Sequence, residues 1–186
     1  MEVAYTCGLK EGLDIDRQWL DEVVRKEEQF RAQNYALNLL SYRARSEREI
    51  MERMQQKGYE SSVIEDTIAY LKEQGYLDDY AFAEMFIRDK SELNKYGQNR
   101  IKTELYKKGV AREVINGLIE EMIDSNSEYE KAKELAKKKI KSYQQDSKQA
   151  LYRKLNGFLI RKGYPYDVVS RVVKELVSNM FDENES

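Results

Sequence analysis

The sequence predicts an all-α protein of three tandem three-helix repeats, preceded by an additional helical segment. A lysine-glycine pair recurs three times, in Lys57-Gly58-Tyr59, Lys108-Gly109-Val110 and Lys162-Gly163-Tyr164, with glycines 51 and 54 residues apart. Apolar residues stand at the same distances from each glycine. The chain also has one proline and nine glycines, few for a β-rich chain that turns every ~8–12 residues. Together these observations indicate helices joined by short turns.

The apolar positions lie eight and four residues before each glycine and five, six, ten and thirteen residues after it. They are Ile50, Met54, Val63, Ile64, Ile68 and Leu71 in the first copy; Ile101, Leu105, Val114, Ile115, Ile119 and Met122 in the second; and Leu155, Leu159, Val168, Val169, Val173 and Leu176 in the third. This spacing is typical of two amphipathic helices. The glycine between them suits the left-handed position that ends a helix.

Helix starts fit the same scheme. Ser46 to Glu49 and Ser62 to Glu65 both match the capping-box pattern, in which a serine and a glutamate satisfy exposed backbone N–H groups. Pro165 suits the first turn of the helix that follows Gly163.

One more helix is expected before each pair, from Tyr35 to about Tyr42, from about Tyr80 to Leu93 and from Tyr129 to about Tyr143. Aspartates of Asp78-Asp79 and Asp124 are suited to cap the second and third of these. The predicted repeats are residues 35–79, 80–126 and 127–179. Residues 1–34 should add one helix, around Trp19 and Val23 and starting near Asp14 or Asp16, and residues 180–186 form an acidic tail. Stacked units of this size predict an elongated, curved molecule.

Composition argues against catalysis and against a metal or other cofactor. The chain has no histidine, which removes the commonest general base and metal ligand. Its single cysteine, Cys7, excludes a disulfide within the chain and a Cys/His zinc site. Asp78-Asp79 fits a helix cap better than a metal site, and no phosphate-binding glycine loop is present. We therefore expect a protein without enzymatic activity. We also expect it in the cytoplasm, because neither a signal peptide nor a membrane-spanning stretch is evident.

Charge is distributed unevenly along the chain. Residues 1–34 and 35–79 each carry a net charge of -3, residues 80–126 are neutral, and residues 127–177 carry +7. Such a basic repeat could meet phosphates, with a binding strength that falls as salt rises. A lysine-rich helix face is, however, more often only a solvated face, and tyrosines near turns, such as Tyr143, more often pack than stack on bases. Candidate partner- or nucleic-acid-binding residues are Arg100, Lys107, Lys108, Lys133, Lys137, Lys138, Lys141, Arg153, Lys154, Arg161 and Lys162.

Four ordered motifs between residues 34 and 177 resemble the RecX family. Ala36-Leu37 with Leu40-Ser41-Tyr42-Arg43-Ala44-Arg45-Ser46-Glu47 resembles the start of the first RecX repeat. Gly75-Tyr76-Leu77-Asp78-Asp79 with Phe82-Ala83 and Phe86-Ile87 is similar to the hallmark of the second, followed by Gly97, Arg100-Ile101, Glu104-Leu105 and Lys108-Gly109-Val110. Leu155, Phe158-Leu159, Arg161-Lys162-Gly163-Tyr164 and Tyr166-Asp167-Val168-Val169 resemble the third. Ala44 departs from the pattern, because the family often has proline there.

The resemblance implies tandem three-helix repeats and a regulator that binds the RecA filament on single-stranded DNA. Such proteins lie in the filament groove and inhibit its ATPase and strand exchange, and many also contact DNA. It further implies a role in DNA repair and SOS regulation. Relatives with this kind of sequence often carry a β-rich N-terminal segment, which this chain is expected to lack. We expect a monomer. A direct DNA-binding protein of the helix-turn-helix kind is the main alternative, although the helices after the glycines are acidic or mixed; a scaffold without nucleic-acid partners is a second.

Overall fold

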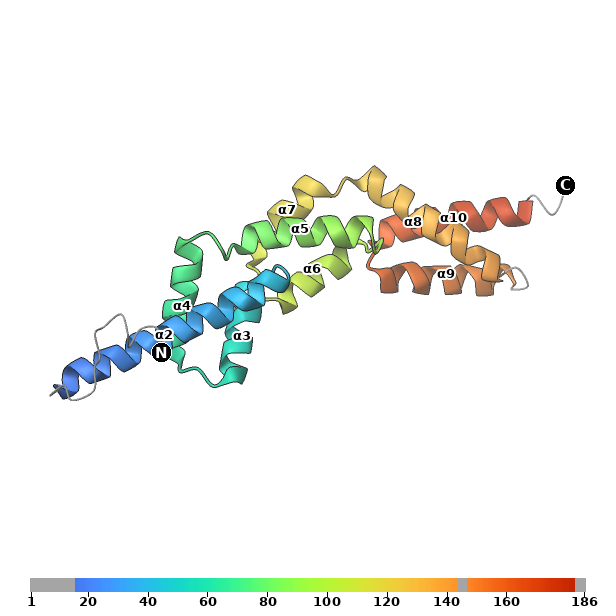
Figure 1. Cartoon of the computed structure of the whole chain (residues 1–186). Helices are drawn as coiled ribbons and strands as arrows, with labels where there is room; N and C mark the ends of the chain where they lie inside the picture. Colours follow the sequence, from blue (N-terminus) through green and yellow to red (C-terminus); the bar gives the residue numbers. More distant parts are fainter. Residues whose placement is uncertain (1–15, 144–146, 183–186) are drawn as a thin grey trace. The chain divides into compact units, whose positions relative to one another are not determined.

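The computed structural model describes residues 16–143 and 147–182, and every regular element in these ranges is a helix (Figure 1). The expectations about Cys7, Asp14 and the last four residues lie outside the described ranges. The chain divides into two compact units, Met1–Phe82 and Ala83–Ser186, which are described separately. No helix among the described residues is both long and apolar enough to cross a membrane. The elements are α2 (Arg17–Tyr42), α3 (Glu47–Lys57), α4 (Ser61–Glu73), α5 (Asp79–Glu92), α6 (Gln98–Lys107), α7 (Arg112–Met122), α8 (Ser125–Ile140), η1 (Lys141–Tyr143), α9 (Lys148–Lys162) and α10 (Tyr166–Asp182).

The first unit is built on α2, which packs against both α3 and α4 (Figure 1). Two helices were expected here, one around Trp19 and another from Tyr35, but the structure joins them into one helix of 26 residues. No glycine or proline interrupts residues 17–42, so nothing in the local sequence forces a break. The core of this unit comprises Ala32, Ala36, Ile50, Met54, Val63, Ile64, Ile68, Leu71 and Leu77.

Of the two capping boxes predicted in the first unit, one is present. Ser46 and Glu49 form a complete capping box at the start of α3. The second predicted box is wrong, because α4 begins at Ser61, two residues earlier than a Ser62 cap requires. Its N-cap residue is Glu60, whose side chain forms no capping hydrogen bond. Asp16 caps α2, and the Asp78 carboxylate accepts hydrogen bonds from the Tyr80 and Ala81 amides at the start of α5.

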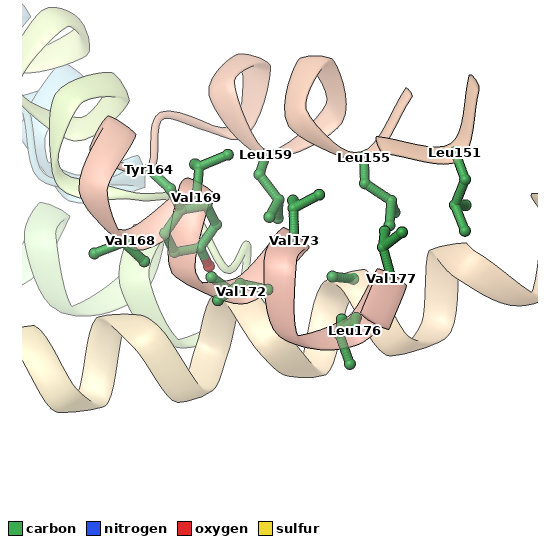
Figure 2. Packing of buried hydrophobic residues seen from close by; sticks show 12 residues of the cluster. Leu151, Leu155, Leu159, Tyr164, Val168, Val169, Val172, Val173, Leu176 and Val177 are labelled. Atoms are coloured by element: carbon green, nitrogen blue, oxygen red, sulfur yellow. The ribbon is translucent and has the colours of Figure 1, made fainter. Parts of the chain in front are cut away.

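The second unit has its main core between α8, α9 and α10. Figure 2 shows Leu151, Leu155 and Leu159, spaced four residues apart, pointing from α9 toward α10. Val169 and Val173 of α10 belong to the same core cluster. All five of these side chains are fully buried. Asp124 caps α8 as predicted, although α8 begins at Ser125 and ends at Ile140 with a short 3-10 turn after it.

The three predicted turn glycines all adopt the left-handed conformation, with φ of 94° at Gly58, 84° at Gly109 and 93° at Gly163. A residue with a side chain is disfavoured there by about 1–2 kcal/mol, which explains why the lysine is followed by glycine in each copy. Pro165 precedes α10 instead of lying in its first turn, and its carbonyl accepts a hydrogen bond from the Val169 amide.

Within the second unit, α6 begins directly against the turn between α9 and α10. The Gly97 amide donates to the Lys162 carbonyl at 2.9 Å, and the Asn99 amide donates to the Gly163 carbonyl at 3.0 Å. A Cβ on Gly97 would lie 2.4 Å from the Gly163 backbone, so only glycine allows this approach. The Tyr164 hydroxyl, on a side chain only 2% exposed, donates to the Lys95 carbonyl. These contacts attach the α5–α6 loop to the third repeat.

A carboxylate completes the same junction. Glu128 is 3% exposed and accepts hydrogen bonds from the Gln98 amide at 2.8 Å and the Gln98 side chain at 2.9 Å. Burial raises its pKa above the usual carboxyl value. Asp79 plays the same part in the first unit, accepting the Glu47 amide at the first residue of α3 at 2.8 Å, and burial raises its pKa as well. The second and third repeats, whose first helices are α5 and α8, therefore each carry a carboxylate near the start of that helix. This carboxylate caps the second helix of the preceding repeat.

Candidate functional site

In the described part of the chain, no group of three or more His, Cys, Asp or Glu side chains is placed to hold a metal ion. The candidate site consists of the basic residues predicted from the sequence. All eleven sequence-predicted basic residues lie in the second unit, on α6, α8, η1 and α9 or next to them. The structure brings only some of them together.

The first group surrounds the ring of Tyr96 in the α5–α6 loop. The Arg100 guanidinium lies 3.7 Å from the ring centroid, the Lys162 ammonium 5.0 Å and the Lys90 ammonium 5.9 Å. Each distance is within the range of a cation–π interaction. The Tyr96 cluster is Phe86, Lys90, Tyr96, Arg100, Lys108 and Lys162, because Lys90 and Lys108 also approach the Phe86 ring at 5.2 and 5.5 Å.

The Tyr96 cluster is held in place by the junction between the second and third repeats. Lys162 belongs to α9 and its ammonium donates to the Asn94 carbonyl at 3.4 Å, while Arg100 belongs to α6 and pairs with Glu104 at 3.0 Å. One carboxylate thus lies among several cations. The cluster gathers four cationic side chains at one place, where they can attract an anionic partner.

The second group lies around Tyr143. The ammonium groups of Lys139 and Lys154 are each 5.2 Å from the Tyr143 centroid, and Lys139 is also 6.0 Å from that of Phe158. The Tyr143 cluster is Lys139, Tyr143, Lys154 and Phe158. Lys154 and Lys162 stand eight residues apart on α9, so the helix separates the two clusters by about 12 Å at 1.5 Å per residue.

The remaining predicted residues fall into two kinds. Lys133 and Lys138 pair with Glu175 at 2.7 Å and Glu134 at 2.6 Å, so their charges are partly compensated within the unit. The others are exposed and form no ion pair with a residue that the structure describes; they are Lys107, Lys137, Lys141, Arg153 and Arg161.

Several members of the clusters were not singled out from the sequence as binding residues. They are Phe86, Lys90, Tyr96 and Phe158. A usable signal was present, because Phe86–Lys90, Tyr96–Arg100, Lys139–Tyr143 and Lys154–Phe158 all pair an aromatic with a cation four residues away. On a helix such pairs are neighbours. Glu128 and Gly97 carried no comparable signal, because their partners are about 30 and 66 residues away in sequence.

Comparison with known protein families covers all three repeats in order. Residues 32–79, 78–117 and 126–173 match the family models described as the first, second and third three-helix domains of RecX. These matches span far more than half of the chain.

Individual relatives agree with the family match. The chain is 35% identical over 182 residues to the regulatory protein RecX of Clostridioides difficile, covering 98% of this chain and 84% of that protein. A crystal structure of a regulatory protein RecX superimposes with a TM-score of 0.80 at 23% identity, covering 92% of this chain and 85% of that one, which supports the fold. The crystal structure of RecX from Lactobacillus salivarius has a TM-score of 0.74 at 26% identity, covering 81% and 97%. With the predicted repeats, the observed helices and these matches in agreement, the chain belongs to the RecX family of regulatory proteins.

Proposed function

We propose that this protein binds the RecA filament on single-stranded DNA and inhibits its ATPase and strand exchange, with a role in DNA repair and in restraining the SOS response. The observation that carries the proposal is the match of all three three-helix domains to RecX, in order and over most of the chain. We further propose that it acts in the cytoplasm and as a monomer.

Inhibition of this kind requires no catalytic residue. A bound protein shifts the equilibrium between two filament states only by the difference in its affinity for them. Repeated three-helix units offer a large surface for such binding, and the second unit offers clustered cations toward DNA or an acidic protein surface.

Direct contact with DNA is the second candidate, and the two cation–aromatic clusters favour it. Proteins that follow single-stranded DNA combine a positive track for the phosphates with rings or guanidinium planes on which bases stack. The Tyr96 and Tyr143 clusters supply both kinds of group along α9. A salt titration of free-DNA binding tests this role, which predicts affinity falling steeply with salt.

The first experiment is a titration of the single-stranded-DNA-dependent ATPase of RecA with this protein at physiological salt. Inhibition at well under one molecule per RecA is expected, because one bound molecule would affect several subunits. An unchanged ATPase rate, with circular dichroism showing a folded helical protein, would reject filament inhibition.

A charge-reversal variant tests the basic surface. Replacing Lys137, Lys138 and Lys141 with glutamate should raise the amount needed for half-inhibition at least about tenfold, since rim charges mainly steer association. The exposed Lys138–Glu134 pair contributes little stability, so the variant should stay folded. Three matched reversals in the first unit, at the exposed Arg17, Arg25 and Lys26, serve as the control. Equal inhibition by both variants and the unmodified protein would remove the third repeat from the interface.

A further inference from the structure

The junction between the second and third repeats shows how this fold holds the N-terminus of a helix. Four groups act on the start of α6: the Glu128 carboxylate, the Lys162 and Gly163 carbonyls, and the Tyr164 hydroxyl. The last three belong to the lysine-glycine-tyrosine turn of the third repeat.

The first unit contains a residue in the corresponding place for every one of these groups. Lys57-Gly58-Tyr59 is the same turn triplet, with Gly58 in the same left-handed conformation as Gly163. Glu28 lies four residues before Ala32, just as Glu128 lies four before Ala132, and both alanines are fully buried. Asp79 and Ala83 repeat this spacing in the second repeat, where the carboxylate also caps a helix. Glu28 of α2 therefore corresponds, by this spacing, to the capping carboxylates Asp79 and Glu128.

Glu28, Gly58 and Tyr59 line a groove in the first unit. It has a volume of about 620 Å³ and an apolar wall from Leu20, Val23 and Val24. The rest of its lining is Glu27 and Arg31, which pair with each other, together with Lys57. We name this groove the Glu28–Gly58 socket.

The surroundings of the two turns differ sharply. A Cβ on Gly163 would lie 2.3 Å from the Arg100 Cβ, whereas a Cβ on Gly58 would meet no residue that the structure describes within 4 Å. Glu28 is exposed, and neither it nor the Tyr59 hydroxyl forms a hydrogen bond with a residue that the structure describes. The socket thus has the groups that hold a helix N-terminus, without such a helix from the described part of the chain.

We propose that the Glu28–Gly58 socket receives the N-terminus of a helix from a partner protein, with glycine at the position before the first helical residue. The first N–H groups of a helix lack internal partners and carry partial positive charge, which a carboxylate and two carbonyls complement. Glycine is specified because the equivalent approach of Gly97 to Gly163 leaves no room for a Cβ. Identifying this partner as RecA rests on the proposed function above.

A second copy of the chain fits this socket less well. Ser46 and Gly97, which precede α3 and α6, lie 12 residues before their turn glycines, but Ser147 lies 16 residues before Gly163. The free end of α9 therefore begins about one turn early and does not repeat the geometry of the α6 start.

The first test uses a labelled synthetic peptide with the sequence of residues 94–110, which contains the start of α6, as a probe for the full-length protein. Fluorescence anisotropy should show saturable binding that Glu28→Arg weakens at least tenfold. Glu22→Arg, the same change at an exposed position of α2 outside the socket, should alter it less than twofold. A peptide with Gly97→Leu should not bind.

Three results would overturn the proposal. They are the absence of saturable binding, equal binding to the Glu28→Arg and unmodified proteins, and a Glu28-dependent dimer in sedimentation without the peptide, which would assign the socket to a second copy.

The second test asks whether the partner is RecA. Glu28→Arg should raise the amount of protein needed for half-inhibition of the RecA ATPase at least tenfold, and Glu22→Arg less than twofold. If the unmodified protein inhibits and Glu28→Arg inhibits equally, the socket is not the RecA contact while the proposed function stands. If the unmodified protein does not inhibit, the proposed function fails and the peptide experiment alone decides the socket.

Discussion

The turns at Gly163 and Gly58 have the same local sequence and the same backbone conformation but different neighbours. Gly163 supports the start of α6, and its carbonyl accepts the Asn99 amide. Gly58 borders a groove, and no described residue lies within 4 Å of the place where its side chain would go. The lysine-glycine pair therefore ends a helix in each repeat. Whether that turn then binds the start of another helix depends on the neighbouring repeat.

The largest difference should appear when each glycine is replaced by alanine. Gly163→Ala combines left-handed strain of about 1–2 kcal/mol with overpacking of about 1–3 kcal/mol against the Arg100 backbone. Gly58→Ala carries only the strain. Urea unfolding followed by circular dichroism should therefore show roughly twice the loss of stability at Gly163. Gly97→Ala separates the two effects, because φ at Gly97 is -76° and only overpacking applies. Equal losses at Gly58 and Gly163 would contradict the close packing at the junction.

Removal of the Glu128 and Glu28 carboxylates should also affect the stability of the two regions differently. Glu128→Ala leaves the half-buried Gln98 amide without its acceptor and should destabilise the protein by about 1–3 kcal/mol. Glu28→Ala should change the stability of the free protein by less than about 0.5 kcal/mol, because Glu28 is exposed. Thermal and urea unfolding of both variants measure this difference. A loss at Glu28 as large as at Glu128 would mean that the socket is already filled.

The two turn tyrosines offer a smaller contrast. Tyr164→Phe removes the hydrogen bond from its hydroxyl to the Lys95 carbonyl and should lower the free energy of unfolding by about 1 kcal/mol. Tyr59→Phe removes a hydroxyl without such a partner among the described residues, and its effect should be close to zero. Spectroscopic pH titration offers a second measurement, because burial raises the pKa of both phenols. Matching stability losses would contradict the different environments of the two rings.

The smallest expected effect is on pH dependence. Burial raises the pKa of Glu128, so the folded protein holds this proton at a higher pH than the unfolded chain. The contribution of Glu128 to the free energy of unfolding should therefore increase as pH falls from neutral toward the usual carboxyl pKa of about 4.3. Glu128→Gln removes the titrating carboxyl group. The difference between the unfolding free energies of this variant and of the unmodified protein, measured at each pH, therefore gives the contribution of Glu128 titration. The charges of Asp167 and Lys131, which also affect the pKa of Glu128, are present in both proteins. A difference of opposite sign would place Glu128 in a stabilising ion pair.

The sequence by itself determined the helical class, the three repeats and the ends of most helices. These features depend on residues a few positions apart, such as the Ser46–Glu49 capping box and the glycine after each lysine. Its errors were also local: α2 continues through residues 34 and 35, and α4 begins before Ser62, because helix propensity without a strong breaker does not fix an end.

Tertiary structure decided which of these locally similar elements meet. Glu28, Asp79 and Glu128 occupy the same place in their repeats, yet only Asp79 and Glu128 cap a helix of the described chain. Likewise, Arg100 and Lys162 converge on Tyr96 because the close approach of Gly97 and Gly163 brings α6 to α9. Local sequence sets the conformation of each turn through backbone sterics and hydrogen bonds within one or two helical turns. The neighbour of each turn depends on packing between residues tens of positions apart, which no local pattern encodes.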